Sequence, residues 1–153
     1  MENEQFEINN VTGEIIVPCN ENDKQIIQTT KIKALQLLNP NDFININGVW
    51  EAKRDALIKI LSSLPICYNW EIKQKELTKE YASITGVLTI TTGNITRSSD
   101  SIGVCEITEL KSVKTLHFMI TRAETRALKR AIEVLFGSVV NYYVERWLSK
   151  TDK

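Results

Sequence analysis

The alternation of apolar and polar positions predicts two helices around a short strand in the first part of the chain. Apolar residues recur near helical spacing over residues 22–38, where an Asn-Pro-Asn run ends the helix. Residues 43–46 alternate as a strand does and lead into an Asn47-Gly48 turn. A second helical pattern covers residues 50–64 and ends at a proline. The first 21 residues show neither period, so we expect an arm or a short edge strand there.

The period then changes from helical to two, which is typical of strands. Residues 66–75, 81–92 and 101–110 are rich in Ile, Val, Thr and aromatic residues, with polar connections at 76–79 and 93–100. Three sequential strands with short links indicate an antiparallel meander.

Helical spacing returns near the C-terminus. A long helix is predicted over 116–136, with Gly137 as its C-cap, and an amphipathic segment over 139–150 closes the chain. The element order places the protein in the α+β class. We expect a strand and helix, then a three-stranded antiparallel β-meander packed against a long α-helix (a βαβββα core), with helical additions at both ends.

The chain length of 153 residues fits one domain. We therefore expect an N-terminal arm over 1–21, a single domain over 22–150 and a tail over 151–153. The hydrophobic content of 42% and the charged content of 25% are those of a globular protein. Neither an apolar leader nor a membrane-length apolar stretch is present in the sequence, so we expect a cytoplasmic protein with no membrane association.

The three cysteines favour a reducing, intracellular setting. Cys19, Cys67 and Cys105 lie far apart, form no CxxC pair and are odd in number. This spacing predicts neither a disulfide framework nor a zinc site. The sequence also contains no GxxxxGK[ST] loop for ATP phosphates, and its acidic residues are scattered rather than clustered as in a metal-dependent nuclease. We expect no cofactor, no metal and no catalytic activity.

Charge is distributed unevenly along the chain although the formal net charge is zero. Residues 1–50 carry three basic and seven acidic side chains, a net charge of −4, and the remaining residues carry sixteen and twelve, a net charge of +4. An anion-binding site is therefore expected in the later part of the chain and must be local.

The segment 119–137, MITRAETRALKRAIEVLFG, separates its charged and small residues when placed on a helix. One face carries a row of four cations, which we call the basic row: Arg122, Arg126, Lys129 and Arg130. A second face carries Ile120, Ala123, Ala127, Ala131 and Val134. Three alanines one turn apart let the helix backbone approach a sheet closely. The row is expected either to contact nucleic-acid phosphates or to be a solvated helix face.

The same segment contains two glutamates, Glu124 and Glu133, whose partners matter for the basic row and for burial. Glu133 is the one counter-charge that the sequence places on the basic face, so we expect the row to be largely unpaired. Glu124 falls on another side, among leucines and an alanine, where an unpaired carboxylate is costly to bury. We expect Glu124 either to pair at a subunit contact or with the sheet, or to be half exposed. A general acid or base role is disfavoured because no second reactive group can be placed beside it.

These residues resemble the signature of a known family. The run GVCEITEL, then His117, then ITRAETRALKRAIEVLFG is similar to the Rad fifty-two type (DdrA-like, Sak-like) single-strand annealing proteins of archaea, bacteria and viruses. Lys129-Arg130-Ala131 and Gly137 match the basic-basic-Ala pattern and closing glycine of their long helix. The upstream FININGVWEAKRDALIKIL resembles the short strand, Gly turn and helix of that family. The resemblance spans residues 42–137.

The resemblance implies single-stranded DNA binding and ATP-independent annealing in DNA recombination and repair. It implies a homo-oligomer, a ring or arc, whose subunits form a continuous positive groove. The implied DNA contacts are Lys53, Arg54, Arg122, Arg126, Lys129 and Arg130. Where the family often has a further basic residue, this chain has Glu133. A recombination partner protein is conceivable, and the sequence names none.

Residues outside the basic row carry further expectations. Arg97, Lys111 and Lys114 lie at the ends of the meander and are either an outer DNA contact or solvated. His117 is expected to cap the helix or donate a hydrogen bond rather than bind metal. Three aromatic residues near the C-terminus are assigned to packing or oligomerisation: Tyr142, Tyr143 and Trp147.

The competing interpretation of the sequence is a non-catalytic interaction or scaffold module. In that case the basic helix contacts an acidic partner protein and DNA binding is incidental.

Overall fold

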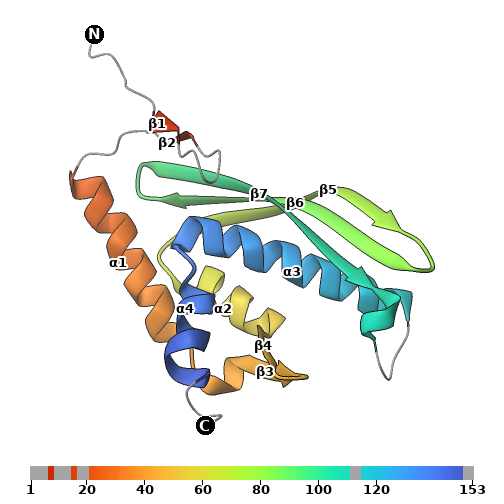
Figure 1. The fold of residues 1–153 in the computed structure, drawn as a ribbon. Coiled ribbons are helices and arrows are strands. Elements are labelled where there is room, and N and C mark those ends of the chain that lie inside the picture. Colours follow the sequence, from red (N-terminus) through yellow and green to blue (C-terminus); the bar gives the residue numbers. More distant parts are fainter. Residues whose placement is uncertain (1–6, 9–14, 17–20, 111–114, 150–153) are drawn as a thin grey trace.

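A computed structural model describes residues 7–8, 15–16, 21–110 and 115–149 and confirms the α+β class (Figure 1). The helices are α1 (Glu21–Leu37), α2 (Arg54–Ser63), α3 (Leu116–Phe136) and α4 (Val139–Tyr143). Short helical turns are η1 (Pro40–Asp42), η2 (Ile107–Glu109) and the π-helical η3 (Val144–Leu148). The strands are β1 (Glu7–Ile8), β2 (Ile15–Ile16), β3 (Phe43–Ile46), β4 (Val49–Ala52), β5 (Cys67–Leu77), β6 (Tyr81–Thr92) and β7 (Ile95–Glu106).

Strands β5, β6 and β7 form the predicted antiparallel meander, with β6 in the centre. Alternate residues of β6 are buried, including Ala82, Ile84, Leu88 and Ile90, because this face of the sheet packs under α3. The opposite face is polar and bears pairs of hydroxyl groups such as Thr89 with Ser98. The sheet therefore buries one face only.

Helix α3 occupies the middle of the molecule, between the sheet and a group formed by α1, α2 and α4 (Figure 1). Its alanine face meets β7 so closely that a Cβ on Gly103 would collide with the backbone of Ala123 and Ala127. Ser101 Oγ donates to the carbonyl of Ala127 at 2.6 Å beside this contact. The predicted close approach of helix and sheet is confirmed.

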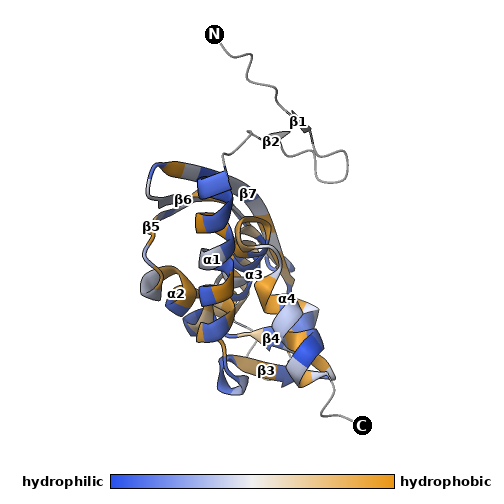
Figure 2. Cartoon of the chain, turned by 90° about the vertical axis from the view of Figure 1, so that its left-hand side faces the viewer, coloured by the Kyte–Doolittle hydropathy of each residue, from blue (hydrophilic) through white to orange (hydrophobic). Residues whose placement is uncertain are grey.

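The far side of α3 completes the main hydrophobic core. Leu128, Ile132, Leu135 and Phe136 are buried there against α1 and α2. Val134 was expected on the alanine face, but it is 46% exposed. Helices α1 and α2 carry both hydrophobic and hydrophilic residues (Figure 2), as expected of helices that cover a core with one face.

The second helix begins later than the sequence predicted. Residues 49–52 form strand β4, which pairs with β3, and α2 starts at Arg54. Asn47 and Gly48 have φ values of 55° and 83°, the positive values of a tight hairpin turn. This turn returns the chain antiparallel to β3, so Trp50 and Glu51 become strand residues instead of helix residues.

Strand β7 also begins six residues earlier than predicted. Gly93, with a φ of 61°, and Asn94 make a tight turn, and pairing resumes at Ile95 opposite Thr92. Thr96, Ser98 and Asp100 resemble a polar loop in sequence because they lie on the open face of the sheet.

The two ends of the chain are described in part. Strands β1 and β2 pair antiparallel within the predicted arm, while the rest of residues 1–20 and the predicted tail at 151–153 lie outside the described residues. Near the C-terminus Tyr143 is buried and stacks on Phe43 with ring centroids 5.1 Å apart. This contact attaches α4 to the β3–β4 hairpin.

Candidate nucleic-acid interface

The basic row lies on one side of α3, as its spacing predicted. Arg122, Arg126 and Lys129 have side chains that are 21%, 28% and 27% exposed, and Arg130 is exposed. The helix that presents them is well bounded. Thr115 Oγ1 accepts from the backbone N–H of Phe118 at its start, and Gly137 adopts the left-handed conformation at its end.

Arg122 and Arg126 are paired with carboxylates from other elements. Arg122 Nη2 lies 3.3 Å from Glu51 Oε1 of β4, and Arg126 Nη2 lies 2.8 Å from Glu109 Oε1 of η2. Glu51 Oε1 is also 3.6 Å from Arg126. The expectation that Glu133 is the one counter-charge on this face is therefore wrong, because the fold brings two distant glutamates to it.

Electrostatics link Arg126 and Glu109 strongly. Hydrogen bonds donated by Arg126 hold the pKa of the Glu109 carboxyl below its usual value, and the same bonds raise the pKa of Arg126. Arg126 Nη1 also donates to the carbonyl of Val104 at 2.7 Å. The guanidinium is thus held by a carboxylate and by the β7 backbone together.

Lys129 and Arg130 have weaker partners than the two arginines. Lys129 Nζ lies 3.9 Å from Glu133 Oε1, which is a long ion pair. Burial raises the pKa of the Glu133 carboxyl, and its Oε1 accepts no hydrogen bond. No ion pair to Arg130 occurs among the described residues. Lys129 and Arg130 are therefore the cations of the row that are most available to an external anion.

Glu124 has the partner that its position required. Arg54 Nη1 and Nη2 donate to its two carboxylate oxygens at 3.0 and 3.3 Å, and Trp70 Nε1 donates at 3.3 Å. The pair joins the start of α2 to α3 and β5 within one chain. Lys53, the residue before α2, is exposed and donates to the carbonyl of Asn41 at 2.8 Å.

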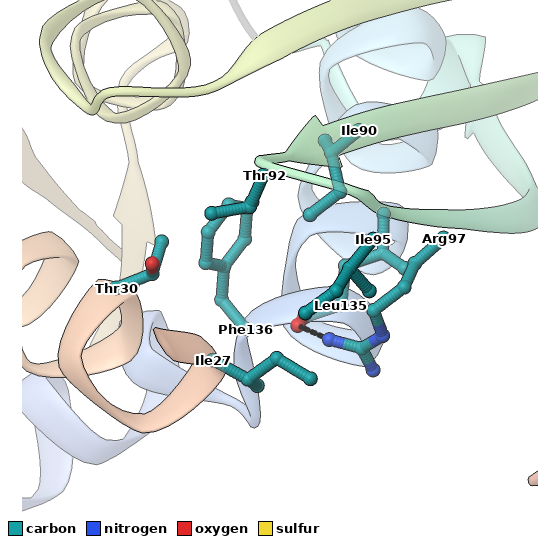
Figure 3. Close-up of a pocket in the computed structure, with 8 residues that line it drawn as sticks. All are labelled: Ile27, Thr30, Ile90, Thr92, Ile95, Arg97, Leu135 and Phe136. Carbon is teal, nitrogen blue, oxygen red and sulfur yellow. Dashed lines mark hydrogen bonds between the residues drawn. The ribbon is translucent and has the colours of Figure 1, made fainter. Parts of the chain in front are cut away.

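The expected outer site has only one described member. Arg97 lies within β7, and its guanidinium donates to the carbonyl of Leu135 at 2.6 Å (Figure 3). Its side chain extends toward the C-terminal end of α3 and lines a small pocket there. The pocket is lined by Ile27, Thr30, Ile90, Thr92, Ile95, Arg97, Leu135 and Phe136. Lys111 and Lys114 lie outside the described residues.

The remaining candidate residues are placed as follows. His117 is exposed and its ring meets Phe118 edge to face, while the capping hydrogen bond is made by Thr115. Tyr142 and Trp147 are 47% and 45% exposed and contact each other edge to face, whereas Tyr143 is buried. Trp147 also contacts the ring of Tyr143, with centroids 4.9 Å apart.

The described residues provide no grouping of three His, Cys, Asp or Glu side chains suited to a metal ion. Cys67 and Cys105 are free, and Cys19 lies outside the described residues. In the described part of the chain, no helix is both long and apolar enough to cross a bilayer. The basic row gathers four cations on one side of α3, and cations so arranged attract anions. Comparison with protein-family models and with curated protein sequences gives no match to this chain.

Proposed function

We propose that the protein binds single-stranded DNA through the basic row and anneals complementary strands without ATP, as a homo-oligomeric ring or arc that acts in recombination and repair. The observation that carries the proposal is the arrangement of four cations along one side of α3. Within the described residues Arg130 makes no direct ion pair and feels Glu133 only through a longer-range charge interaction, while Lys129 makes a long ion pair to Glu133. No catalytic residue is assigned.

The charge balance of this surface favours an anion. Four cations of the row face three carboxylates, those of Glu51, Glu109 and Glu133. The surface is therefore net positive although the chain as a whole has no net charge. Local excess charge of this kind attracts a polyanion.

The length of the row explains why an oligomer belongs to the proposal. Arg122 and Arg130 are eight residues apart, which corresponds to about 12 Å along a helix. Such a row contacts only a few phosphates of one strand, so one subunit binds weakly. Repeated rows on neighbouring subunits engage the same strand and raise the overall affinity. Contacts to phosphates also leave the bases free to pair.

Arg54 and Lys53 take different parts in this proposal. Arg54 is 40% exposed although Glu124 holds it, so one side of its guanidinium remains open to solvent. Lys53 is exposed, and its neighbour Asn41 accepts one of its three ammonium protons. We propose both side chains as secondary phosphate contacts outside the row.

The test is a titration of fluorescent single-stranded oligonucleotide with the variant Lys129→Ala, Arg130→Ala. We expect affinity to fall about tenfold and the slope of log affinity against log salt to become shallower by about 1.4, the value for two lost phosphate contacts on a single strand. The matched control is Lys73→Ala, Lys79→Ala, which removes the same charge from the exposed β5 strand and its turn. Equal affinity for the wild type and the row variant contradicts the proposal.

Annealing and assembly are measured separately. Complementary oligonucleotides, one with a fluorophore and one with a quencher, report annealing in the absence of ATP. The mass of the native protein with and without an oligonucleotide reports the oligomer. A monomer at all concentrations contradicts the ring or arc.

A second candidate is an interaction module for an acidic protein. Arg122 and Arg126 already bind carboxylates in this structure, so the same side of α3 accepts acidic side chains. Binding to single strands, duplex DNA and an acidic polypeptide at two salt concentrations separates the candidates. Preference for the polypeptide over single strands favours the interaction module.

A further inference from the structure

Two arginines of the basic row are occupied by the protein's own carboxylates, which come from two different elements and both reach Arg126. Glu51 comes from β4 and contacts Arg122 at 3.3 and 3.4 Å. Glu109 comes from η2 and contacts Arg126 with two hydrogen bonds of 2.8 and 3.0 Å. An external anion that reaches these arginines meets positions already filled by oxygen acceptors.

A carboxylate and a phosphate use the same part of a guanidinium. Both present two oxygens to the planar fork of N–H donors, and both form charge-assisted bonds with it. A phosphate can therefore bind either arginine fully only after the carboxylate moves away. The two anions compete for one set of donors.

The carboxylates can exchange their arginine partners for water because the ion pairs lie near the surface. Glu109 Oε2 also accepts from the N–H of Glu106 at 2.7 Å, so displacement there leaves the carboxylate attached to its own turn. The side chains of Glu51 and Glu109 are 30% and 36% exposed, so water can solvate them after release. The arginines keep other anchors. Arg126 donates to the carbonyl of Val104, and Arg122 Nη1 lies 3.5 Å from the carbonyl of Glu109. Release of a carboxylate thus leaves the guanidinium close to its place.

We propose that Glu51 and Glu109 are internal competitors that set the affinity of the basic row for the DNA backbone. This inference rests on the proposed function. In the free protein Lys129 makes only a long ion pair to Glu133, and Arg130 makes no direct ion pair within the described residues. Arg122 and Arg126 become phosphate ligands only when a bound strand displaces the two glutamates. A strand held in this way is released readily, which an annealing protein requires when its product is a duplex.

The test compares single-strand affinity of the wild type and the variant Glu51→Gln, Glu109→Gln. We expect at least fivefold tighter binding, with a steeper salt dependence because more phosphates are neutralised. The control Glu80→Gln, Asp100→Asn also removes two negative charges. Both positions are exposed, one in the β5–β6 turn and one on the open face of the sheet. The control is expected to change affinity less than twofold.

The outcomes separate this inference from the function on which it rests. If the wild type binds single strands and the glutamine variant binds no more tightly, or if the control strengthens binding equally, the competitor role is wrong and the proposed function stands. If neither protein binds, the proposed function fails and this inference fails with it. Should the double variant not fold, Glu51→Gln alone keeps the stronger Glu109 pair and is expected to give at least a twofold gain. No gain in that folded single variant overturns the competitor role.

Discussion

Gly103 of β7 lies directly against Ala123 of α3, with strand and helix backbones in contact. A Cβ at residue 103 would collide with the carbonyl oxygen of Ala123 and with the nitrogen of Ala127. This contact places α3 across the sheet and fixes the side on which the basic row emerges. Small residues are thus required on both elements, glycine on the strand and alanine on the helix.

The first prediction follows from that contact. Gly103→Ala is expected to destabilise the protein by about 2–3 kcal/mol, because the added methyl group must push two backbone segments apart. The loss is measured as a change in the free energy of unfolding in urea. The neighbouring substitution Ile102→Thr affects a side chain that is 46% exposed on the open face, and it should cost less than about 1 kcal/mol. Equal losses for the two variants contradict the backbone contact.

The second prediction concerns the pair that joins α2 to α3. Arg54→Met leaves Glu124, whose side chain is 18% exposed, with Trp70 as its remaining donor, and it is expected to cost about 1–2 kcal/mol. Glu124→Gln leaves Arg54, which is 40% exposed and can be hydrated, so its cost should be smaller.

A double-mutant cycle tests the same pair. Arg54→Met with Glu124→Gln should cost less than the sum of the single changes, because each single change already breaks the bidentate bond. The free energies come from urea unfolding at one pH and one salt concentration. Strictly additive costs would show that the two side chains do not interact in solution.

The spacing of apolar residues was enough to predict the strands and helices in which buried and exposed side chains alternate regularly. Strand β6 and helix α3 carry their pattern over 12 and 21 residues, and both were predicted with the bounds observed. Strand β4 was missed because four residues next to a helix carry no period of their own, and their pairing with β3 decides their conformation. The start of β7 was missed because its outward residues are hydroxylated and acidic, as in a loop.

The candidate site was predictable in part for the same reason. Spacing along one helix is a local property, so the basic row was found in the sequence. Its counter-charges are not local. Glu51 is 71 residues from Arg122, and Glu109 is 17 residues from Arg126. Only the packing of β4 and η2 beside α3 brings these carboxylates to the row, and no pattern in the sequence predicts that packing.

The third prediction concerns the dependence of stability on pH through Glu133. Burial raises the pKa of this carboxyl in the folded protein above the ordinary 4.5. A raised acid pKa means that the folded state binds a proton more tightly than the unfolded state does. As pH rises from 4.5 through the folded pKa, ionisation of Glu133 therefore lowers the free energy of unfolding. Below 4.5 both states are protonated and this effect is absent.

Glu133→Gln removes the ionisable group, so comparison with the wild type gives the effect of Glu133 ionisation on the free energy of unfolding. The variant is expected to be more stable than the wild type at pH 7, with the difference shrinking toward pH 4. Urea unfolding at several pH values measures both curves, and Glu145→Gln, a change at an exposed residue of η3, provides the control. Because Lys129 lies 3.9 Å from Glu133 and opposes the effect of burial, a variant less stable than the wild type at pH 7 would mean that this ion pair outweighs desolvation.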